Sequence, residues 1–227
     1  MPQLRAAELV DDACLRLVLA ATGEPDPLPR RHPAHLLLEL AGGPGCADEL
    51  LAALAAAGVA DDPDIDVAVA DDPAGVRRLW GYRERITESV GAHGVPHKLD
   101  VSVPATSTAA FVQRCGALVR GWPGVAGTGR APRPFFFGHL GDGNVHVNVL
   151  DADPRDDALD DAVLALAAEL DGSISAEHGI GRAKAHLLHL TRTADERAAM
   201  AALKHALDPA GRLGRALSAG DGARRPA

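Results

Sequence analysis

The chain has 227 residues, of which 47% are apolar and 3% aromatic, and its formal net charge is −8 at pH 7. This length allows one large folded domain or two small ones. The acidic balance argues against nucleic acid as a partner, and no apolar run is long enough for a membrane span or a signal-peptide core. We therefore expect a cytoplasmic protein whose scattered cysteines are free thiols.

The first half of the chain predicts alternating helices and strands. The expected elements are an amphipathic helix over 3–22, a strand over 36–40, a helix over 46–57 closed by Gly58, an alternating strand over 65–70, and a helix from Pro73 to about Val90 with Asp72 as its N-cap.

The second half predicts a strand, a helix and then a β-hairpin. The expected elements are a strand over 98–103, a helix to about Val119, a loop over 121–134, hairpin strands over 135–140 and 145–150, a helix over 155–170, a short extended piece over 174–176, and helices near 182–190 and 194–207. This order predicts an α+β domain with an antiparallel sheet, helices on one side, and a doubled ferredoxin-like arrangement. The tail from Ser218 is expected to be disordered.

The hairpin carries the first candidate site. Its tip is Gly141-Asp142-Gly143-Asn144, and the predicted register pairs His139 with His146, with Cβ atoms roughly 5 Å apart. Asn148 follows His146 by two residues and shares its face. Two imidazoles at this separation can hold one metal ion, although turn chemistry alone also accounts for the glycines and the aspartate.

A second candidate site is the glycine-framed stretch 172–181, which contains Glu177 and His178. Glu177 would complete a His-His-Glu ligand set, and three protein ligands with an open position are typical of catalytic metal sites. Imidazole and carboxylate ligands suit zinc, with iron(II) or manganese as alternatives. His178 is then a candidate general base. A His-Glu pair on its own is more often a surface or helix-cap feature.

A third stretch offers cations. Arg83 and Thr87 are four residues apart and are expected on one helical face, and Lys98 follows on the next strand. Taken alone, Arg83 is better explained as a solvated helix residue.

Three motifs in this order resemble the C-terminal cap domain of FAD-linked oxidases of the vanillyl-alcohol oxidase type. They are GHxGDGNxH at 138–146, SxxAEHGxG at 173–181 and LDPxGxL at 207–213, and the resemblance extends from about residue 7 to 217. That family oxidises D-2-hydroxy acids. The runs 80–87 and 98–104 look most like its D-2-hydroxyglutarate dehydrogenases.

The resemblance implies roles for individual residues. It implies that a divalent metal, usually zinc, is bound by His139, His146 and Glu177. It implies that the substrate is contacted by Arg83, Thr87, Lys98 and Asn148. It also implies that His178 is the base that takes the hydroxyl proton. It also implies FAD, bound mainly by a flavin-binding domain that we expect to lie outside this chain. The family continues LDPxGxL with Asn-Pro-Gly-Lys, whereas here Gly214-Arg215 follows. Binding of FAD by this chain alone is therefore not expected.

The leading hypothesis is that residues 1–217 form the substrate- and metal-binding domain of a flavin-dependent D-2-hydroxy-acid dehydrogenase. Its expected partners are a small 2-hydroxy acid, preferably a dicarboxylate, and a flavin-binding domain or subunit. One alternative is a non-catalytic remnant or subunit of a split oxidase that binds a metal or an acid. A metal-dependent hydrolase is a third hypothesis.

Overall fold

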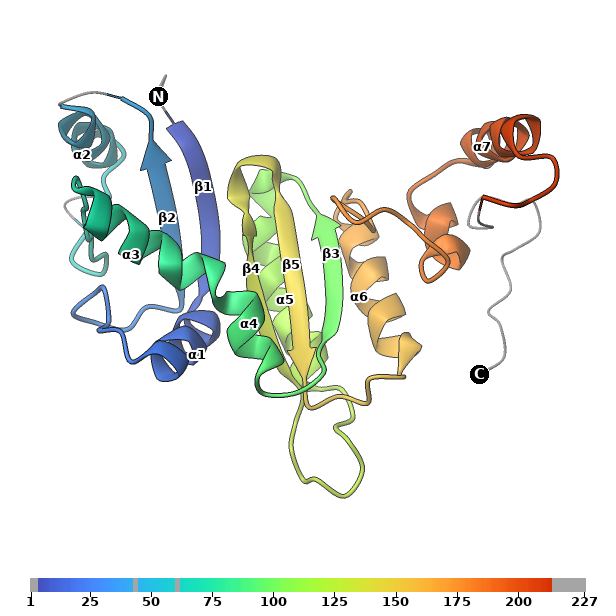
Figure 1. Ribbon diagram of the computed structural model, residues 1–227, viewed down its shortest axis with the longest axis horizontal. Helices are drawn as coiled ribbons and strands as arrows, with labels where there is room; N and C mark the ends of the chain where they lie inside the picture. Colours follow the sequence, from blue (N-terminus) through green and yellow to red (C-terminus); the bar gives the residue numbers. More distant parts are fainter. Residues whose placement is uncertain (1–3, 43–44, 60–61, 214–227) are drawn as a thin grey trace.

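The computed structural model describes residues 4–42, 45–59 and 62–213 (Figure 1). At its centre lies a five-stranded antiparallel sheet with the order β2-β1-β4-β5-β3. The strands are β1 (Leu4–Asp11), β2 (Ala34–Leu40), β3 (His97–Ser102), β4 (Arg133–His139) and β5 (Asn144–Leu150). The α-helices are α1 (Asp12–Thr22), α2 (Cys46–Ala56), α3 (Pro73–Glu84), α4 (Ile86–Gly91), α5 (Thr108–Arg120), α6 (Asp157–Glu169) and α7 (Ala194–Leu207). The predicted α+β class and antiparallel sheet are confirmed.

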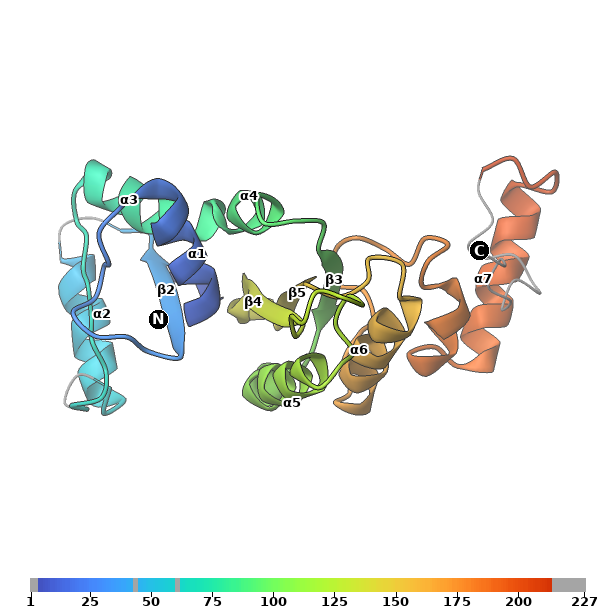
Figure 2. The same ribbon diagram turned by 90° about the horizontal axis from the view of Figure 1, so that it is seen from below.

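Helices cover both faces of the sheet, so the expectation of helices on one side is wrong (Figure 2). Phe136 belongs to the core cluster that includes residues of α5 and α6. Its neighbours Phe135 and Phe137 belong to a second cluster with residues of α1 and α4. Successive strand residues point to opposite faces, so three consecutive buried phenylalanines require an apolar layer on each side.

The predicted ferredoxin-like unit is found only once among the described residues, in the second half of the chain. There the chain runs β3-α5-β4-β5-α6, and Ser173 then pairs with Ser102 of β3. This is ferredoxin-like connectivity in which the last strand, expected over 174–176, is reduced to one bridge. The first half contributes β1 and β2, whereas residues 65–70, predicted as a strand, pair with no strand in the described ranges.

The N-terminal segment corrects a second expectation. Residues 3–22 were predicted as one helix, but 4–11 form β1 and only 12–22 are helical. β1 hydrogen-bonds to β2 on one side and to β4 on the other, so tertiary pairing outweighs the helical periodicity. Asp11 ends the strand and caps the helix, because its side chain accepts a hydrogen bond from the backbone N–H of Cys14.

The predicted helix from Pro73 is present, with Asp72 as its N-cap, but it is interrupted at Arg85. Arg83 therefore lies in the last turn of α3 and Thr87 in the first turn of α4. Arg85 itself keeps αR backbone angles, so the shared helical face of these two residues stays a prediction.

The C-terminal part of the described chain is helical, as expected. A 3-10 helix covers Ala185–Leu190, and α7 begins with a capping box between Thr193 and Glu196. The predicted disordered tail from Ser218 lies outside the described residues. Within the described ranges, no helix combines the length and apolar character that crossing a membrane requires.

A buried histidine links β3 to α6 and predicts a pH dependence of stability. Nδ1 of His97 lies 2.7 Å from Oδ1 of Asp160, and Nε2 lies 2.8 Å from the carbonyl oxygen of Asp153. The hydrogen bond to Asp160 raises the pKa of His97 above its ordinary value. A raised pKa in the folded state stabilises the protein below about pH 6.5, and this contribution is lost as pH rises through the folded-state pKa.

We therefore expect His97→Gln to remove part of the decline in unfolding free energy above about pH 6.5. Urea denaturation of both proteins across this range measures the difference. A wild-type minus variant difference that is constant with pH would contradict the assignment.

Candidate metal centre

The β4–β5 hairpin presents two histidines on one face of the sheet. The predicted pairing of His139 with His146 is shifted by two residues, because His146 lies opposite Phe137. A shift of two residues preserves the face, so the two imidazoles are diagonal neighbours with ring centroids 5.8 Å apart. The shift arises because residues 140–143 form the turn, with a 3-10 segment over Leu140–Asp142 and Gly143 in the left-handed region at φ 74°.

Gly143 closes this turn against the neighbouring strand segment. Its carbonyl oxygen accepts a hydrogen bond from the N–H of Val103 at 3.0 Å. A Cβ at this position would lie 1.9 Å from the carbonyl oxygen of Val103, so no side chain fits. Asp142 contributes by accepting the N–H of Asn144. The Asp-Gly pair therefore sets where β5 begins and which residues of β5 face the site.

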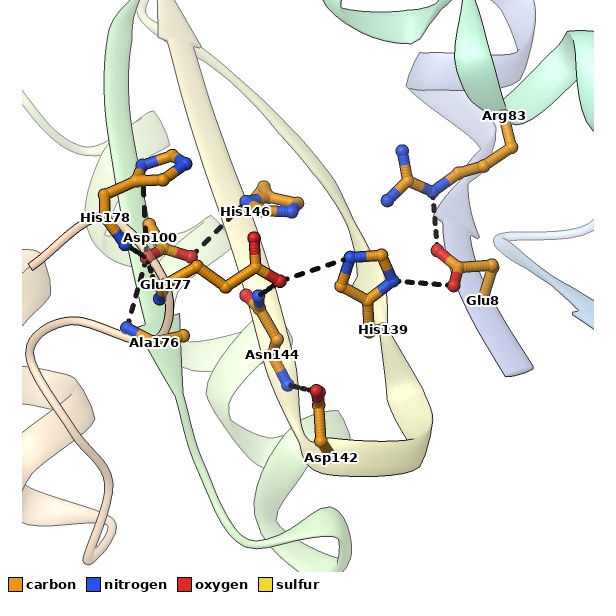
Figure 3. Close-up of polar contacts among 10 residues, drawn as sticks. All are labelled: Glu8, Arg83, Asp100, His139, Asp142, Asn144, His146, Ala176, Glu177 and His178. Atoms are coloured by element: carbon orange, nitrogen blue, oxygen red, sulfur yellow. Dashed lines mark hydrogen bonds and ion pairs between the residues drawn. The ribbon is translucent and has the colours of Figure 1, made fainter. Parts of the chain in front are cut away.

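Glu177 joins the two histidines, as predicted (Figure 3). His139, His146 and Glu177 each offer one ligand atom, and these atoms lie within 4.8 Å of one another. Oε1 of Glu177 lies 3.3 Å from Nε2 of His139 and accepts a hydrogen bond from Nδ2 of Asn144 at 2.9 Å. Two imidazoles and one carboxylate suit zinc.

A buried carboxylate lies behind His139. Oε1 of Glu8 is 2.7 Å from Nδ1 of His139, which leaves Nε2 directed toward Glu177. Oε2 of Glu8 accepts a hydrogen bond from Nε of Arg83 at 2.8 Å. The Arg83 guanidinium also lies over the ring of Phe137, 4.8 Å from its centroid. Glu8 therefore connects His139, a predicted metal ligand, to Arg83, a predicted substrate cation.

A second buried carboxylate, Asp100, lies behind His146. Oδ1 of Asp100 is 3.5 Å from Nδ1 of His146, and Oδ2 accepts three backbone N–H groups from residues 176–178. Burial alone would raise the pKa of Asp100, but these donors outweigh it and the pKa is lowered. Burial lowers the pKa of His146, despite the opposing effect of Asp100. The lowered pKa favours the neutral imidazole, which is the form that binds metals.

The remaining predicted site residues surround this cluster at different distances. His178 stacks beside His146 with ring centroids 6.0 Å apart, and its side chain is 63% exposed. Asn148 is buried on β5 and lies opposite the exposed Lys98 of β3, on the face that carries His146. Thr87 is exposed on α4, and its side chain makes no hydrogen bond within the described ranges.

Three polar residues of the site were not predicted from the sequence: Glu8, Asp100 and Asn144. The alternating pattern of 98–103 places Asp100 on the polar face, and the turn motif contains Asn144, so both had a local signal. Glu8 had none, because the segment 3–22 reads as helix and its approach to His139 depends on the pairing of β1 with β4.

Comparison with known proteins identifies the class. Residues 2–216 match the family described as FAD linked oxidases, C-terminal domain. The match covers nearly the whole chain, and the chain belongs to this family.

Similar proteins of this family include several D-2-hydroxyglutarate dehydrogenases. The chain is 37% identical to the D-2-hydroxyglutarate dehydrogenase of Xanthomonas citri pv. viticola, over 91% of this chain and 44% of the relative. It is 35% identical to the mitochondrial D-2-hydroxyglutarate dehydrogenase of Rattus norvegicus and 30% identical to that of Danio rerio, in each case over 92% of this chain and 38% of the relative. The chain thus spans less than half the length of these relatives. Both bacterial and mitochondrial proteins are among them, so the cytoplasmic location stays a prediction.

The hairpin turn generates a test of how the site is built. We expect Gly143→Ala to destabilise the protein by about 3 kcal/mol, because the new Cβ collides with the Val103 carbonyl and the backbone is left-handed. Gly141→Ala is the matched control, since Gly141 has open space around its Cβ position. Urea denaturation measures both variants. Equal stability of the two would contradict the close approach at Gly143.

Proposed function

We propose that this chain is the substrate- and metal-binding domain of an FAD-dependent D-2-hydroxy-acid dehydrogenase. The observation that carries the proposal is the convergence of His139, His146 and Glu177 on the sheet face that Arg83 borders. Membership of the FAD linked oxidase family supports it, as do the names of the relatives. A flavin-binding domain or subunit would complete the enzyme and hold the FAD.

The three ligand residues fit a divalent metal, for which zinc is our choice. Their donor atoms are close enough to share one ion. Glu8 hydrogen-bonds Nδ1 of His139, and Asp100 lies 3.5 Å from Nδ1 of His146. Such carboxylate–histidine pairs are the usual outer shell of zinc sites. When bound, the metal would supply a Lewis acid that lowers the pKa of the substrate's 2-hydroxyl group.

His178 is the proposed base for the hydroxyl proton. Its backbone is held by Asp100 while its ring remains exposed beside His146, so the ring can reach a substrate next to the ligands. Imidazole titrates near neutral pH, which suits proton acceptance. The flavin would accept the hydride that leaves C2 of the substrate.

The cations around the site favour a dicarboxylate substrate such as D-2-hydroxyglutarate or malate. Arg83 lies over Phe137 of β4, and Lys98 lies on β3, on the other side of β5. Arg83 and Lys98 therefore lie on opposite sides of β5, the strand that carries His146. Nε of Arg83 is engaged by Glu8, which leaves its terminal nitrogens to bind a carboxylate.

The first test of this proposal is metal binding. We expect close to one zinc ion per chain by elemental analysis and calorimetry. His139→Ala should weaken zinc binding by more than about a hundredfold, because loss of an outer-shell partner alone costs about 10–100-fold. His205→Ala, an exposed histidine of α7, serves as the control and should bind like wild type. Absence of zinc binding by the wild-type protein would contradict the proposed metal site.

The second test concerns the substrate. We expect the zinc-loaded chain to bind D-2-hydroxyglutarate more tightly than D-lactate by about 1–3 kcal/mol, the value of one charged hydrogen bond. Lys98→Met should remove most of this difference and leave D-lactate binding nearly unchanged. Calorimetric titration with each acid measures this difference in binding free energy. If Lys98→Met weakens the binding of both acids equally, Lys98 does not bind a second carboxylate.

A further inference from the structure

Asp100 is the most buried charged group of the site, with 1% of its surface exposed. It lies on β3, opposite His146 of β5 in the antiparallel register. Neither the ligand set nor the proposed substrate contacts include it. Burying a carboxylate is costly unless several donors compensate, so the use made of its two oxygens reveals its role.

One carboxylate oxygen holds the loop that carries Glu177 and His178. Oδ2 accepts hydrogen bonds from the backbone N–H groups of Ala176, Glu177 and His178 at 3.1, 2.7 and 3.0 Å. Three consecutive N–H groups directed at one atom define the path of this backbone. Both functional side chains of the loop therefore leave it from positions set by Asp100.

The other oxygen faces the histidine ligand. Oδ1 lies 3.5 Å from Nδ1 of His146, longer than a hydrogen bond, and makes no hydrogen bond to any described residue. Because Oδ1 can only accept, it favours the tautomer in which Nδ1 carries the proton and Nε2 keeps its lone pair. A single side chain thus adjoins one ligand, His146, and holds the backbone of another, Glu177.

We propose that Asp100 is the positioning residue that assembles the metal centre before the metal binds. It fixes the His146 tautomer through Oδ1 and the Glu177–His178 backbone through Oδ2. Glu8 has only the first of these functions, for His139. The proposal rests on the proposed function of His139, His146 and Glu177 as metal ligands, and it assigns to Asp100 the preorganisation of that same site.

An amide cannot replace this carboxylate. In Asp100→Asn, one oxygen can still accept the three loop N–H groups, but the amide NH2 then faces Nδ1 of His146. An NH2 group only donates, so it favours the opposite tautomer. In that tautomer Nε2 carries the proton and has no lone pair with which to bind a metal. Lys184 should hold the 174–178 loop against β3 in this variant as well. Its Nζ donates hydrogen bonds to the backbone carbonyl oxygens of Asp100 and Ile174, which the substitution does not change.

The test compares wild type, Asp100→Asn and the control Asp156→Asn. Asp156 also accepts a backbone N–H, from Ala158, but it lies at the start of α6 and contacts Trp122 instead of the site. Long-range 1H–15N spectra of the metal-free proteins report the His146 tautomer, and calorimetry with zinc reports affinity. We expect Nδ1–H in wild type and in Asp156→Asn, and Nε2–H in Asp100→Asn with a zinc Kd about 10–100-fold weaker.

Two outcomes would overturn the proposal. One is an Nε2–H tautomer of His146 in metal-free wild type, which needs no variant and so remains decisive if Asp100→Asn does not fold. The other is a folded Asp100→Asn that keeps the Nδ1–H tautomer and wild-type zinc affinity. If wild type shows Nδ1–H but binds no zinc, the proposed metal function fails while the tautomer comparison still tests Asp100.

Discussion

The antiparallel pairing of β4 and β5 is the constraint on which the site depends. Because side chains alternate along each strand, this pair sends Phe136 and Val147 into one core and His139 and His146 to the opposite face. The turn at Gly143 sets the register, and the register keeps both histidines on one face. Packing of the apolar side therefore holds the polar side in place, and the histidines do not need contacts with each other to stay aligned.

Buried carboxylates lie beside both histidines of the hairpin. Each histidine has a buried carboxylate near its Nδ1: Glu8 of β1 lies 2.7 Å from that of His139, and Asp100 of β3 lies 3.5 Å from that of His146. These strands flank the hairpin on its two sides in the order β1-β4-β5-β3. The sheet order thus places a carboxylate beside each imidazole, and Figure 3 shows the continuous polar chain from Arg83 to His178 that results. Such a chain orients ligands without relying on flexible loops alone.

The helices contribute differently on the two sides of the sheet. α5 and α6 lie on one face of the sheet and pack against the cluster that contains Phe136, whereas α1, α3 and α4 lie on the other face with the cluster that contains Phe137 (Figure 2). α3 brings Arg83 over Phe137, which gives the site a cation at its border.

Local sequence determined the second half of this protein well. The strand over 98–103, the helix that follows, the hairpin, and the proximity of Glu177 to His139 and His146 were all predicted. Their signals are short-range: alternation of period two, Asp-Gly at a turn, and glycines around Glu177 and His178. The first half was decided by tertiary structure. Residues 4–11 have helical periodicity and became β1 because β2 and β4 pair with them. Glu8 entered the site by that pairing, across 131 residues of sequence. Contacts of this range depend on which strands become neighbours, and no local pattern specifies that choice.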